Sequence, residues 1–443
     1  MNIVLYVRDS KDYAIISVNA LRALSGVESE RIDLYVLDNA SEDGLRDWAV
    51  QQEDLTYIYM DEGYVPVGKA VNMLVRELEF SEDFVFLTAG SLPVPGALSK
   101  LRNNESGDAK VSMTVPVTNV GAGDSCDSRF DSYEEFAKEH IGSNKTELSR
   151  VLSPYTDGFL IDIEAFKDLG GFDEELEGIQ NVLIDLALRS NIAGYKVLLN
   201  KGAAVWKNAQ AYESEKKDEF ELLNRKWNTH YFNISSNRNI VTLAVNGLKK
   251  GANVLEVGCD MGATLLDIKN KCENVNIYGT DINETAVRIA GAFANTCVSD
   301  IEKDEIFEGV SFDRIIFGDV LEHLRDPESV LKKFSKRLSK GGSFVISVPN
   351  LMHISVMKQL LNGYFTYTET GLLDKTHIHF FTYKELIIML ERIGGKVEFM
   401  GKVRVPMEKG DDTLIGELAK LGDGVTKDMF ETYQYVVTVR FEG

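Results

Sequence analysis

The stretch "VLEVGCDMGATL" combines an expected strand, a turn that contains glycine and the start of a helix. Gly258 and Gly262 allow the backbone to turn tightly and to come close to a ligand. The free N–H groups at the start of the following helix favour a carboxylate or a phosphate. The stretch therefore has the parts of a nucleotide-type site, and an ordinary strand-to-helix turn is the alternative.

Acidic residues follow the next two expected strands. Asp281 ends the strand in "IYGTDIN", where its carboxylate can accept hydrogen bonds from both hydroxyls of a ribose. Asp300 in "CVSDIEKD" follows the third strand, from where it can reach an adenine amino group. Solvated surface acids are the alternative, but the order and spacing through three strands favour a cofactor that contains a nucleoside.

Asp260 decides between two possible cofactors, a dinucleotide such as NAD and S-adenosylmethionine. A dinucleotide fingerprint has its middle glycine at this place, because the backbone must approach a pyrophosphate. The Asp260 carboxylate would crowd and repel that pyrophosphate. S-adenosylmethionine has no phosphate, and its methionine end carries an ammonium group. The sequence therefore predicts S-adenosylmethionine rather than NAD.

Residues 240–443 resemble a class I S-adenosylmethionine-dependent methyltransferase with a Rossmann-like fold. Two long motifs carry the resemblance, "FDRIIFGDVLEHLRDPESVLKKFSKRLSKGGSFVISVPN" and "GLLDKTHIHFFTYKELIIMLERIGGKV". The second is similar to a subgroup found with sugar and cell-surface glycan pathways. The resemblance implies that Asp281 holds the ribose, that Asp300 holds the adenine and that Asp319 faces the transferred methyl group. It places the methionine end near Glu256, Gly258, Cys259, Asp260 and Gly262.

Two histidines are candidate catalytic bases, because a sugar hydroxyl needs a base before it can attack a methyl group. His323 stands in "DVLEH" and His377 in "LDKTHIHF", with Asp374 as a possible orienting group, and histidine titrates near neutrality. The alternatives are that His323 packs over the cofactor and that His377 shapes the acceptor loop. His379 is interpreted as structural. No cluster has zinc-ligand spacing, so we predict no metal centre here; a magnesium ion is the alternative, since some sugar methyltransferases use one.

The first half carries a second set of ligand-type residues. In "IDLYVLDNASEDG" the carboxylate of Asp38 ends a strand, a place that suits nucleotide hydroxyls or a base edge. In "EGYVPVGKAVNMLV" Lys69 and Asn72 stand at a helix start, which suits a phosphate. With "GGFDEEL" and "LIDLALRSNIAGYKV", these motifs make residues 1–228 resemble a family 2 glycosyltransferase of the GT-A fold. The resemblance implies that Asp38 contacts the nucleoside.

The acidic metal-binding motif of that family is absent. Its place is taken by residues 88–91, Thr-Ala-Gly-Ser, which contain no carboxylate. A metal-assisted transferase needs the cation to neutralise the leaving diphosphate. A divalent metal is therefore not expected in this half, and Ser91 remains as a polar contact for a sugar nucleotide.

The usual acidic pair before the "DLALR" helix is also missing, because Val182 and Leu183 stand there. Candidates for a displaced base are Asp173, which is also assigned to sugar-nucleotide contacts, and two nearby acids, Glu174 and Glu177. The two departures together favour a degenerate site. The half either transfers a sugar or serves as a non-catalytic module that binds a glycan, a nucleotide or a partner.

The 443 residues predict two α/β domains, because both halves alternate apolar strands with helical patterns. The expected domains are 1–228 and 240–443, joined by a linker at 229–239. An insertion at about 402–432 would cover the acceptor site or form a dimer surface, and a homo-oligomer is left open.

Composition excludes several classes of partner. The net charge of −21 disfavours nucleic acid, which draws on basic surfaces. No apolar run reaches the roughly 18 residues of a membrane span. The four cysteines show no pairing pattern, which favours the cytoplasm. Together with the composition, the two resemblances imply a cytoplasmic, bifunctional transferase of polysaccharide biosynthesis that methylates a sugar or glycan, with the first half adding or recognising a sugar.

Overall fold

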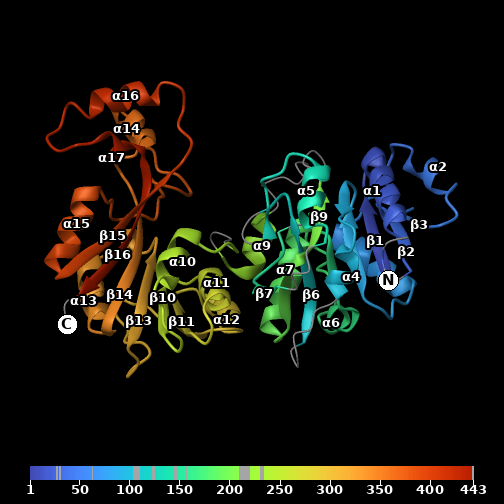
Figure 1. The fold of residues 1–443 in the computed structure, drawn as a ribbon, viewed down its shortest axis with the longest axis horizontal. Helices are drawn as coiled ribbons and strands as arrows, with labels where there is room; N and C mark the ends of the chain where they lie inside the picture. The colour runs from blue at the N-terminus through green and yellow to red at the C-terminus, as the bar shows by residue number, and fades with distance from the viewer. Residues whose placement is uncertain are drawn as a thin grey trace. The chain divides into compact units, whose positions relative to one another are not determined.

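The computed structural model divides the chain into two compact units, Met1–Ser235 and Ser236–Gly443 (Figure 1). The structure describes residues 1–25, 28, 31–61, 63–102, 110–121, 125–142, 147–155, 157–208, 220–229 and 234–441. Residues 230–233 of the expected linker lie outside the described residues.

The described strands of the N-terminal unit form a nine-stranded sheet with the order β3-β2-β1-β4-β8-β6-β9-β5, and β7 pairs with β9. The strands are β1 Asn2–Val7, β2 Asp33–Asp38, β3 Thr56–Tyr59, β4 Phe84–Thr88, β5 Ser91–Pro93, β6 Val111–Thr118, β7 Leu148–Val151, β8 Phe159–Ile161 and β9 Lys196–Lys207. The helices are α1 Lys11–Leu24, α2 Leu45–Ala49, α3 Val67–Glu77, α4 Ala97–Arg102, α5 Tyr133–His140, α6 Ile163–Asp168, α7 Ile179–Ile192 and α9 Phe220–Trp227.

The side chains of strand β4 are buried on both faces of this sheet. Successive side chains of a strand point to opposite faces. Val85 and Leu87 accordingly join the core cluster that contains the buried face of α1. Phe84 packs edge-on against Phe166, and Phe86 packs against Phe172 on the other face. Since β1, β2, β3 and β4 run parallel, their carboxyl ends meet at one edge of the sheet.

The described strands of the C-terminal unit form a seven-stranded sheet with the order β12-β11-β10-β13-β14-β16-β15. The strands are β10 Asn253–Val257, β11 Asn276–Asp281, β12 Asn295–Val298, β13 Phe312–Gly318, β14 Leu338–Pro349, β15 Gly395–Arg404 and β16 Thr432–Phe441. The helices are α10 Arg238–Val245, α11 Ala263–Lys271, α12 Glu284–Ala290, the 3-10 helix η3 Leu321–His323, α13 Pro327–Ser335, α14 Ile354–Leu361, α15 Tyr383–Arg392, α16 Asp411–Leu418 and α17 Lys427–Glu431.

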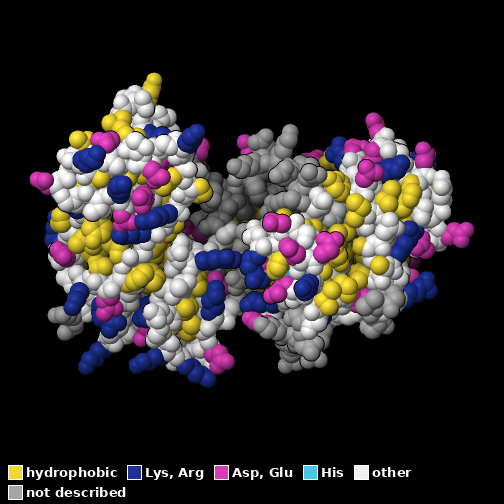
Figure 2. Space-filling view, turned by 45° about the horizontal axis from the view of Figure 1, so that its top comes forward, with side chains coloured by type: hydrophobic (Ala, Val, Ile, Leu, Met, Phe, Trp, Pro, Cys, Tyr) yellow, Lys and Arg dark blue, Asp and Glu magenta, His cyan; other side chains and the backbone are white. Residues whose placement is uncertain are grey.

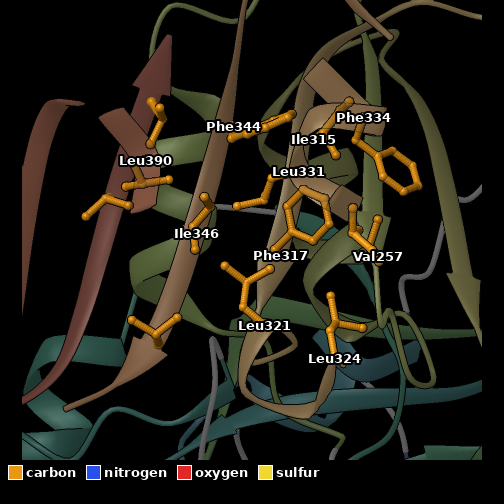
Figure 3. Close-up of a cluster of buried hydrophobic side chains, with 14 of the residues drawn as sticks. Val257, Ile315, Phe317, Leu321, Leu324, Leu331, Phe334, Phe344, Ile346 and Leu390 are labelled. Carbon is orange, nitrogen blue, oxygen red and sulfur yellow. The ribbon is translucent and has the colours of Figure 1, made fainter. Parts of the chain in front are cut away.

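Six strands of this sheet run in the same direction, and β16 runs antiparallel between β14 and β15. Helices α13 and α15 cover one face through a cluster of buried aliphatic and aromatic side chains. Figure 3 shows Phe317 of β13 and Ile346 of β14 in this cluster, together with Leu321 and Leu324 from the turn after β13. The turn is thus anchored by two apolar side chains that enter the core.

Residues between β15 and β16 fold into a small helical layer. Strand β15 ends at Arg404 and β16 begins at Thr432, with α16 and α17 between them. Ile415 and Leu418 of α16 pack with Phe430 of α17 and with Ile354 of α14 in a separate apolar cluster. Figure 1 shows these three helices grouped beyond the end of the sheet. The insertion is therefore held to α14 by apolar packing.

Apolar runs in the sequence predict strands, and the structure has a strand at each of these places, with ends that differ by a few residues. The predicted places are 3–7, 32–38, 55–60, 83–88, 110–117, the run in "DGFLIDI", 252–258, 275–281, the run before Asp300, 312–319, 342–350, 396–401 and 433–441. The sequence prediction missed β5, β7 and β9. Strand β5 has only three residues, and β9 contains the polar stretch Asn200-Lys201-Gly202, which interrupts its apolar pattern.

The surface carries both signs of charge. On the face drawn in Figure 2, Lys and Arg side chains are interspersed with Asp and Glu side chains. Among the residues that the structure describes, no helix has the length and apolar character needed to cross a membrane.

Candidate functional site

The ends of β10, β11 and β13 bring the predicted cofactor residues to one edge of the C-terminal sheet. These three strands are parallel and adjacent in the sheet. The N–H groups of Gly258 and Cys259 donate to the carbonyl oxygen of Thr280, at 2.8 and 3.0 Å. The turn after β10 is therefore fixed directly to the end of β11.

Gly258 and Gly262 are required by the backbone and by close packing. Both have positive φ values, +68° and +80°, which side chains with a Cβ rarely adopt. A Cβ at Gly258 would lie 2.5 Å from Cγ2 of Val320, and one at Gly262 would lie 2.9 Å from Cβ of Ala290. The nearest atoms to both glycines are thus side chains of the protein itself.

Three carboxylates converge at this edge. The N–H of Asp260 donates to Oδ2 of Asp281 at 2.9 Å, and the N–H of Asn283 donates to Oδ1 of Asp281 at 2.9 Å. Glu256 is 5% exposed, and its Oε2 has no hydrogen-bond partner among the described residues. Burial, with the nearby charges of Asp260 and Asp281, raises the pKa of Glu256 well above its ordinary value.

The pKa of Asp260 is also raised at this site. Burial, and then the charge of Asp281, raise the pKa of Asp260 to about 7. Burial also raises the pKa of the Cys259 thiol, whose Sγ lies 3.5 Å from the carbonyl oxygen of Asp260. The site therefore favours protonated acids until a cation enters it.

Asp300 lies in a different environment. Its side chain is 40% exposed and forms an ion pair with Lys303 at 2.5 Å, and its Oδ1 accepts from the N–H of Glu302 at 3.1 Å. The structure thus places Asp300 after β12, as expected from the sequence, but its carboxylate is engaged by its own turn.

Asp319 follows β13 and is held from β14 and β16. Its carboxylate accepts from Nε2 of Gln434 at 2.7 and 2.8 Å, and Oδ1 also accepts from the hydroxyl of Ser347 at 3.1 Å. Burial raises the pKa of Asp319. Its φ of +55° is a left-handed conformation that is uncommon for a residue with a side chain.

The turn after β13 brings His323 and His377 together, although 53 residues separate them in the sequence. The carbonyl oxygen of Glu322 accepts from the N–H groups of Ile378 and His379, at 2.9 and 3.0 Å. The imidazole rings of His323 and His377 then lie 4.9 Å apart, centroid to centroid. Burial, followed by the proximity of His323, lowers the pKa of His377.

The remaining residues of this segment have structural contacts. The carboxylate of Asp374 accepts from the N–H and the hydroxyl of Thr376, at 2.8 and 2.6 Å, and its carbonyl oxygen accepts from the N–H of His377 at 3.0 Å. Nε2 of His379 lies 3.2 Å from the carbonyl oxygen of Arg325. Sequence reasoning missed Glu322, which is 1% exposed and sits between the core residue Leu321 and His323.

In the N-terminal unit, a buried ion pair occupies the place of the absent acidic motif. Nζ of Lys207 lies 2.9 Å from Oδ1 of Asp157, and both side chains are about 5% exposed or less. Oδ2 of Asp157 accepts from the hydroxyl of Ser91 at 2.7 Å and from the N–H of Thr88 at 2.6 Å. An ammonium group thus balances the carboxylate here, and the fully buried Ser91 is committed to this network.

The groups of this network together determine the pKa of Asp157. Burial alone would raise the pKa of Asp157, yet Lys207 and the hydrogen bonds from Ser91 and Thr88 bring it below its ordinary value. Sequence reasoning missed both members of the pair, because no local pattern links a lysine in β9 to an aspartate 50 residues earlier.

The other predicted sugar-nucleotide residues are dispersed. Asp38 is fully buried, and its carboxylate accepts from the N–H of Ser41 at 2.8 Å and from the hydroxyl of Tyr57 at 2.6 Å. Lys69 is half-buried in the first turn of α3. Asp173 forms an ion pair with Lys226 of α9, which also lies 2.7 Å from Asp185.

Asn72 has a structural role that differs from the predicted phosphate contact. Its Nδ2 donates to the carbonyl oxygen of Phe172 at 2.8 Å, and its Oδ1 accepts from the N–H of Phe172 at 2.9 Å. A Cβ at Gly171 would lie 2.5 Å from Oδ1 of Asn72, which explains the glycine there. The amide therefore fixes the turn between α6 and α7.

A comparison with known protein families gives a match that lies mostly in the C-terminal unit. Residues 230–398 match a family model described as "Methyltransferase domain". This part of the chain is a methyltransferase domain. It carries the Rossmann-like fold of transferases that take their methyl group from S-adenosylmethionine, and the order of its strands agrees with that fold.

A curated relative is "N-methyltransferase 4" of Papaver somniferum, 26% identical over 109 residues, which are 23% of this chain and 31% of that protein. The chain thus spans about a third of the length of this relative.

Two solved structures are among those to which the chain is similar. A TehB-like methyltransferase of Corynebacterium glutamicum is 17% identical, covers 53% of this chain and 100% of its own, and has a TM-score of 0.32. The magnesium protoporphyrin IX methyltransferase of Synechocystis, solved with bound SAH, is 14% identical, covers 51% of this chain and 98% of its own, and has a TM-score of 0.34.

Replacing Lys207 by methionine is expected to destabilise the N-terminal unit by about 3–5 kcal/mol, because the buried Asp157 then lacks its partner. All three tryptophans, Trp48, Trp206 and Trp227, lie in this unit, so tryptophan fluorescence during urea unfolding of the full chain reports on it. The double variant Lys207→Met with Asp157→Asn is the control and should recover part of the loss. Equal stability of wild type and Lys207→Met would contradict the assignment.

Replacing Asp260 by asparagine is expected to stabilise the ligand-free protein much more at pH 8 than at pH 5. The folded-state pKa of about 7 is above the unfolded value of about 3.9, so the folded protein favours the protonated acid. Stability from this group is present at low pH and is lost as the pH rises from about 4 to 7. Scanning calorimetry should show an increase of a few degrees at pH 8.

The matched control for this experiment is Asp423→Asn, which alters an exposed carboxylate of the same unit. It should leave the unfolding temperature unchanged at both pH values. An Asp260→Asn protein with the wild-type pH profile would show that Asp260 does not titrate near pH 7.

Proposed function

We propose that this protein transfers the methyl group of S-adenosylmethionine to a sugar or glycan. The observation that carries the proposal is the convergence of Glu256, Asp260 and Asp281 at the edge formed by β10 and β11. Three carboxylates in a buried site repel one another, and a ligand with positive charge removes that cost. S-adenosylmethionine carries two cationic groups, a sulfonium and an ammonium.

The residues of the site fit this cofactor. Oε2 of Glu256 is a buried acceptor with no partner among the described residues, and a buried acceptor without a hydrogen bond is costly. The carboxylate of Asp281 lies at the end of β11, where it can accept from ribose hydroxyls. In the proposed arrangement Glu256 and Asp260 face the methionine end, Asp281 holds the ribose and Asp300 faces the adenine.

The cofactor supplies an electrophilic methyl group, so the protein must mainly align an acceptor with it and keep water away. Asp319 is held in a fixed position by Gln434 and Ser347, at the end of the strand next to β10. We propose that Asp319 marks the position of the reacting methyl group, with His323 and His377 on the acceptor side.

A cleft beside this position suits a polar acceptor. It has a volume of about 650 Å³, and α14 and the insertion contribute to its lining. Tyr433, which lines it, directly precedes Gln434, the residue that holds Asp319. Sugar hydroxyls would meet donors and acceptors there, and an aromatic ring can pack against the sugar. The lining residues with such groups include His353, Lys358, Gln359, Asn362, Asp411 and Tyr433.

For the N-terminal unit we propose recognition of a sugar nucleotide or glycan by a GT-A-like domain, without metal-dependent transfer. The supporting observation is the Lys207–Asp157 pair, whose carboxylate binds Thr88 and Ser91, the residues that stand where the sequence of the resembled family has its acidic motif. In a polysaccharide pathway, the linkage of a glycan-recognition domain to a methyltransferase domain would present the bound glycan to the methyltransferase site at a raised effective concentration.

Incubation of the full-length protein with methyl-labelled S-adenosylmethionine and a panel of glycan acceptors should give labelled glycan. Asp281→Ala should lower cofactor affinity about 100-fold or more, because hydrogen bonds to a charged group contribute about 1.5–3 kcal/mol each. Glu273→Ala, which alters an exposed acid at the opposite end of β11 from Asp281, is the control and should keep full activity. No transfer to any glycan, with normal cofactor binding, would exclude the acceptor class but not methyl transfer itself.

A thermal-shift titration with UDP- and dTDP-sugars tests the N-terminal proposal. We expect stabilisation that does not depend on added Mg²⁺ or Mn²⁺, and no release of nucleoside diphosphate. Turnover that requires the metal ion would contradict the proposed recognition role.

A further inference from the structure

Glu322, His323 and His377 form a compact group of metal-ligating side chains. Each offers one ligand atom, and these atoms all lie within 4.8 Å of one another. Two of the residues belong to η3, directly after β13, and the third comes from the loop that Glu322 binds through its carbonyl oxygen. The group is therefore assembled by the fold and not by a short sequence motif.

Both histidines are oriented in the manner of metal ligands. Nδ1 of His323 lies 3.3 Å from the carbonyl oxygen of Thr376, and Nδ1 of His377 lies 3.3 Å from the carbonyl oxygen of Leu372. A carbonyl oxygen only accepts, so an Nδ1 that donates to it leaves Nε2 with a free lone pair; the hydroxyl of Thr376 also lies 3.2 Å from Nδ1 of His323. A backbone carbonyl that binds the second nitrogen is the usual support of a histidine that ligates a metal.

Glu322 provides an independent indication of a ligand. Its side chain is 1% exposed, and its Oε2 has no hydrogen-bond partner among the described residues. Buried polar atoms are nearly always paired, so an unpaired carboxylate oxygen beside two imidazoles requires an explanation. A bound cation would satisfy it.

The geometry points to a binding site for a divalent transition metal ion, held by Glu322, His323 and His377. Two imidazoles and one carboxylate suit Mn²⁺, Fe²⁺, Co²⁺ or Zn²⁺ better than Mg²⁺, which prefers oxygen ligands. In a tetrahedral arrangement, two atoms bound to one ion at about 2.1 Å are about 3.4 Å apart. Contraction of the group by about 1–1.5 Å, through side-chain rotation, therefore closes the site.

Three protein ligands leave coordination positions open. If the proposed function is correct, these positions hold oxygen atoms of the sugar acceptor, because η3 follows the same strand that ends at Asp319. With both Nε2 atoms on the ion, neither histidine is available as the general base that the sequence predicts. The metal site itself does not depend on the proposed function.

Equilibrium dialysis of the chelator-treated full-length protein against Mn²⁺, Co²⁺ or Zn²⁺, without cofactor or acceptor, tests the site. We expect one ion per chain and at least a tenfold loss of affinity in His323→Ala, in His377→Ala and in Glu322→Gln. His379→Ala is the matched control from the same segment and should bind as the wild type does.

His323 is exposed, so its alanine variant is expected to fold even if a variant of the buried Glu322 does not. Far-UV circular dichroism and the unfolding temperature of each variant serve as the check of folding. The inference is overturned if the wild type binds none of the three ions at millimolar concentration. It is also overturned if folded His323→Ala and His377→Ala bind them as tightly as His379→Ala does.

Discussion

The C-terminal unit depends on negative charge that the fold concentrates at one edge of a parallel sheet. Parallel strands bring their carboxyl ends together, and in this chain those ends carry Glu256, Asp281 and Asp319. The protein contributes few compensating groups there, so the pKa of each of Glu256, Asp260 and Asp319 is raised by burial. Such an arrangement is costly for the empty protein and favourable for a cationic ligand.

The N-terminal unit resolves the same electrostatic problem in the opposite way. Its sheet also gathers strand ends at one edge, but Lys207 neutralises Asp157 within hydrogen-bond distance. Ser91 and the N–H of Thr88 complete the coordination of that carboxylate. One unit therefore leaves buried charge for a ligand, whereas the other satisfies it internally. This contrast is the physical basis for placing chemistry in the C-terminal unit.

Sequence patterns predicted the strands and the residues at their ends because both depend on local order. Continuous apolar runs, glycine turns and acids such as Asp281 can be read within a few residues of one another. Contacts between distant segments could not be predicted in this way. The pairing of Lys207 with Asp157, the amide of Asn72 on Phe172 and the approach of His377 to His323 all depend on tertiary structure.

The central claim is that the carboxylates around β10 and β11 receive the cationic end of S-adenosylmethionine. Calorimetric titration of the full-length protein near pH 7, in buffers with different ionisation enthalpies, tests it most directly. The account predicts binding of one cofactor per chain with net release of protons, because a cation lowers the pKa of Asp260 from about 7. Absence of binding at millimolar cofactor, or binding without proton release, would contradict the account.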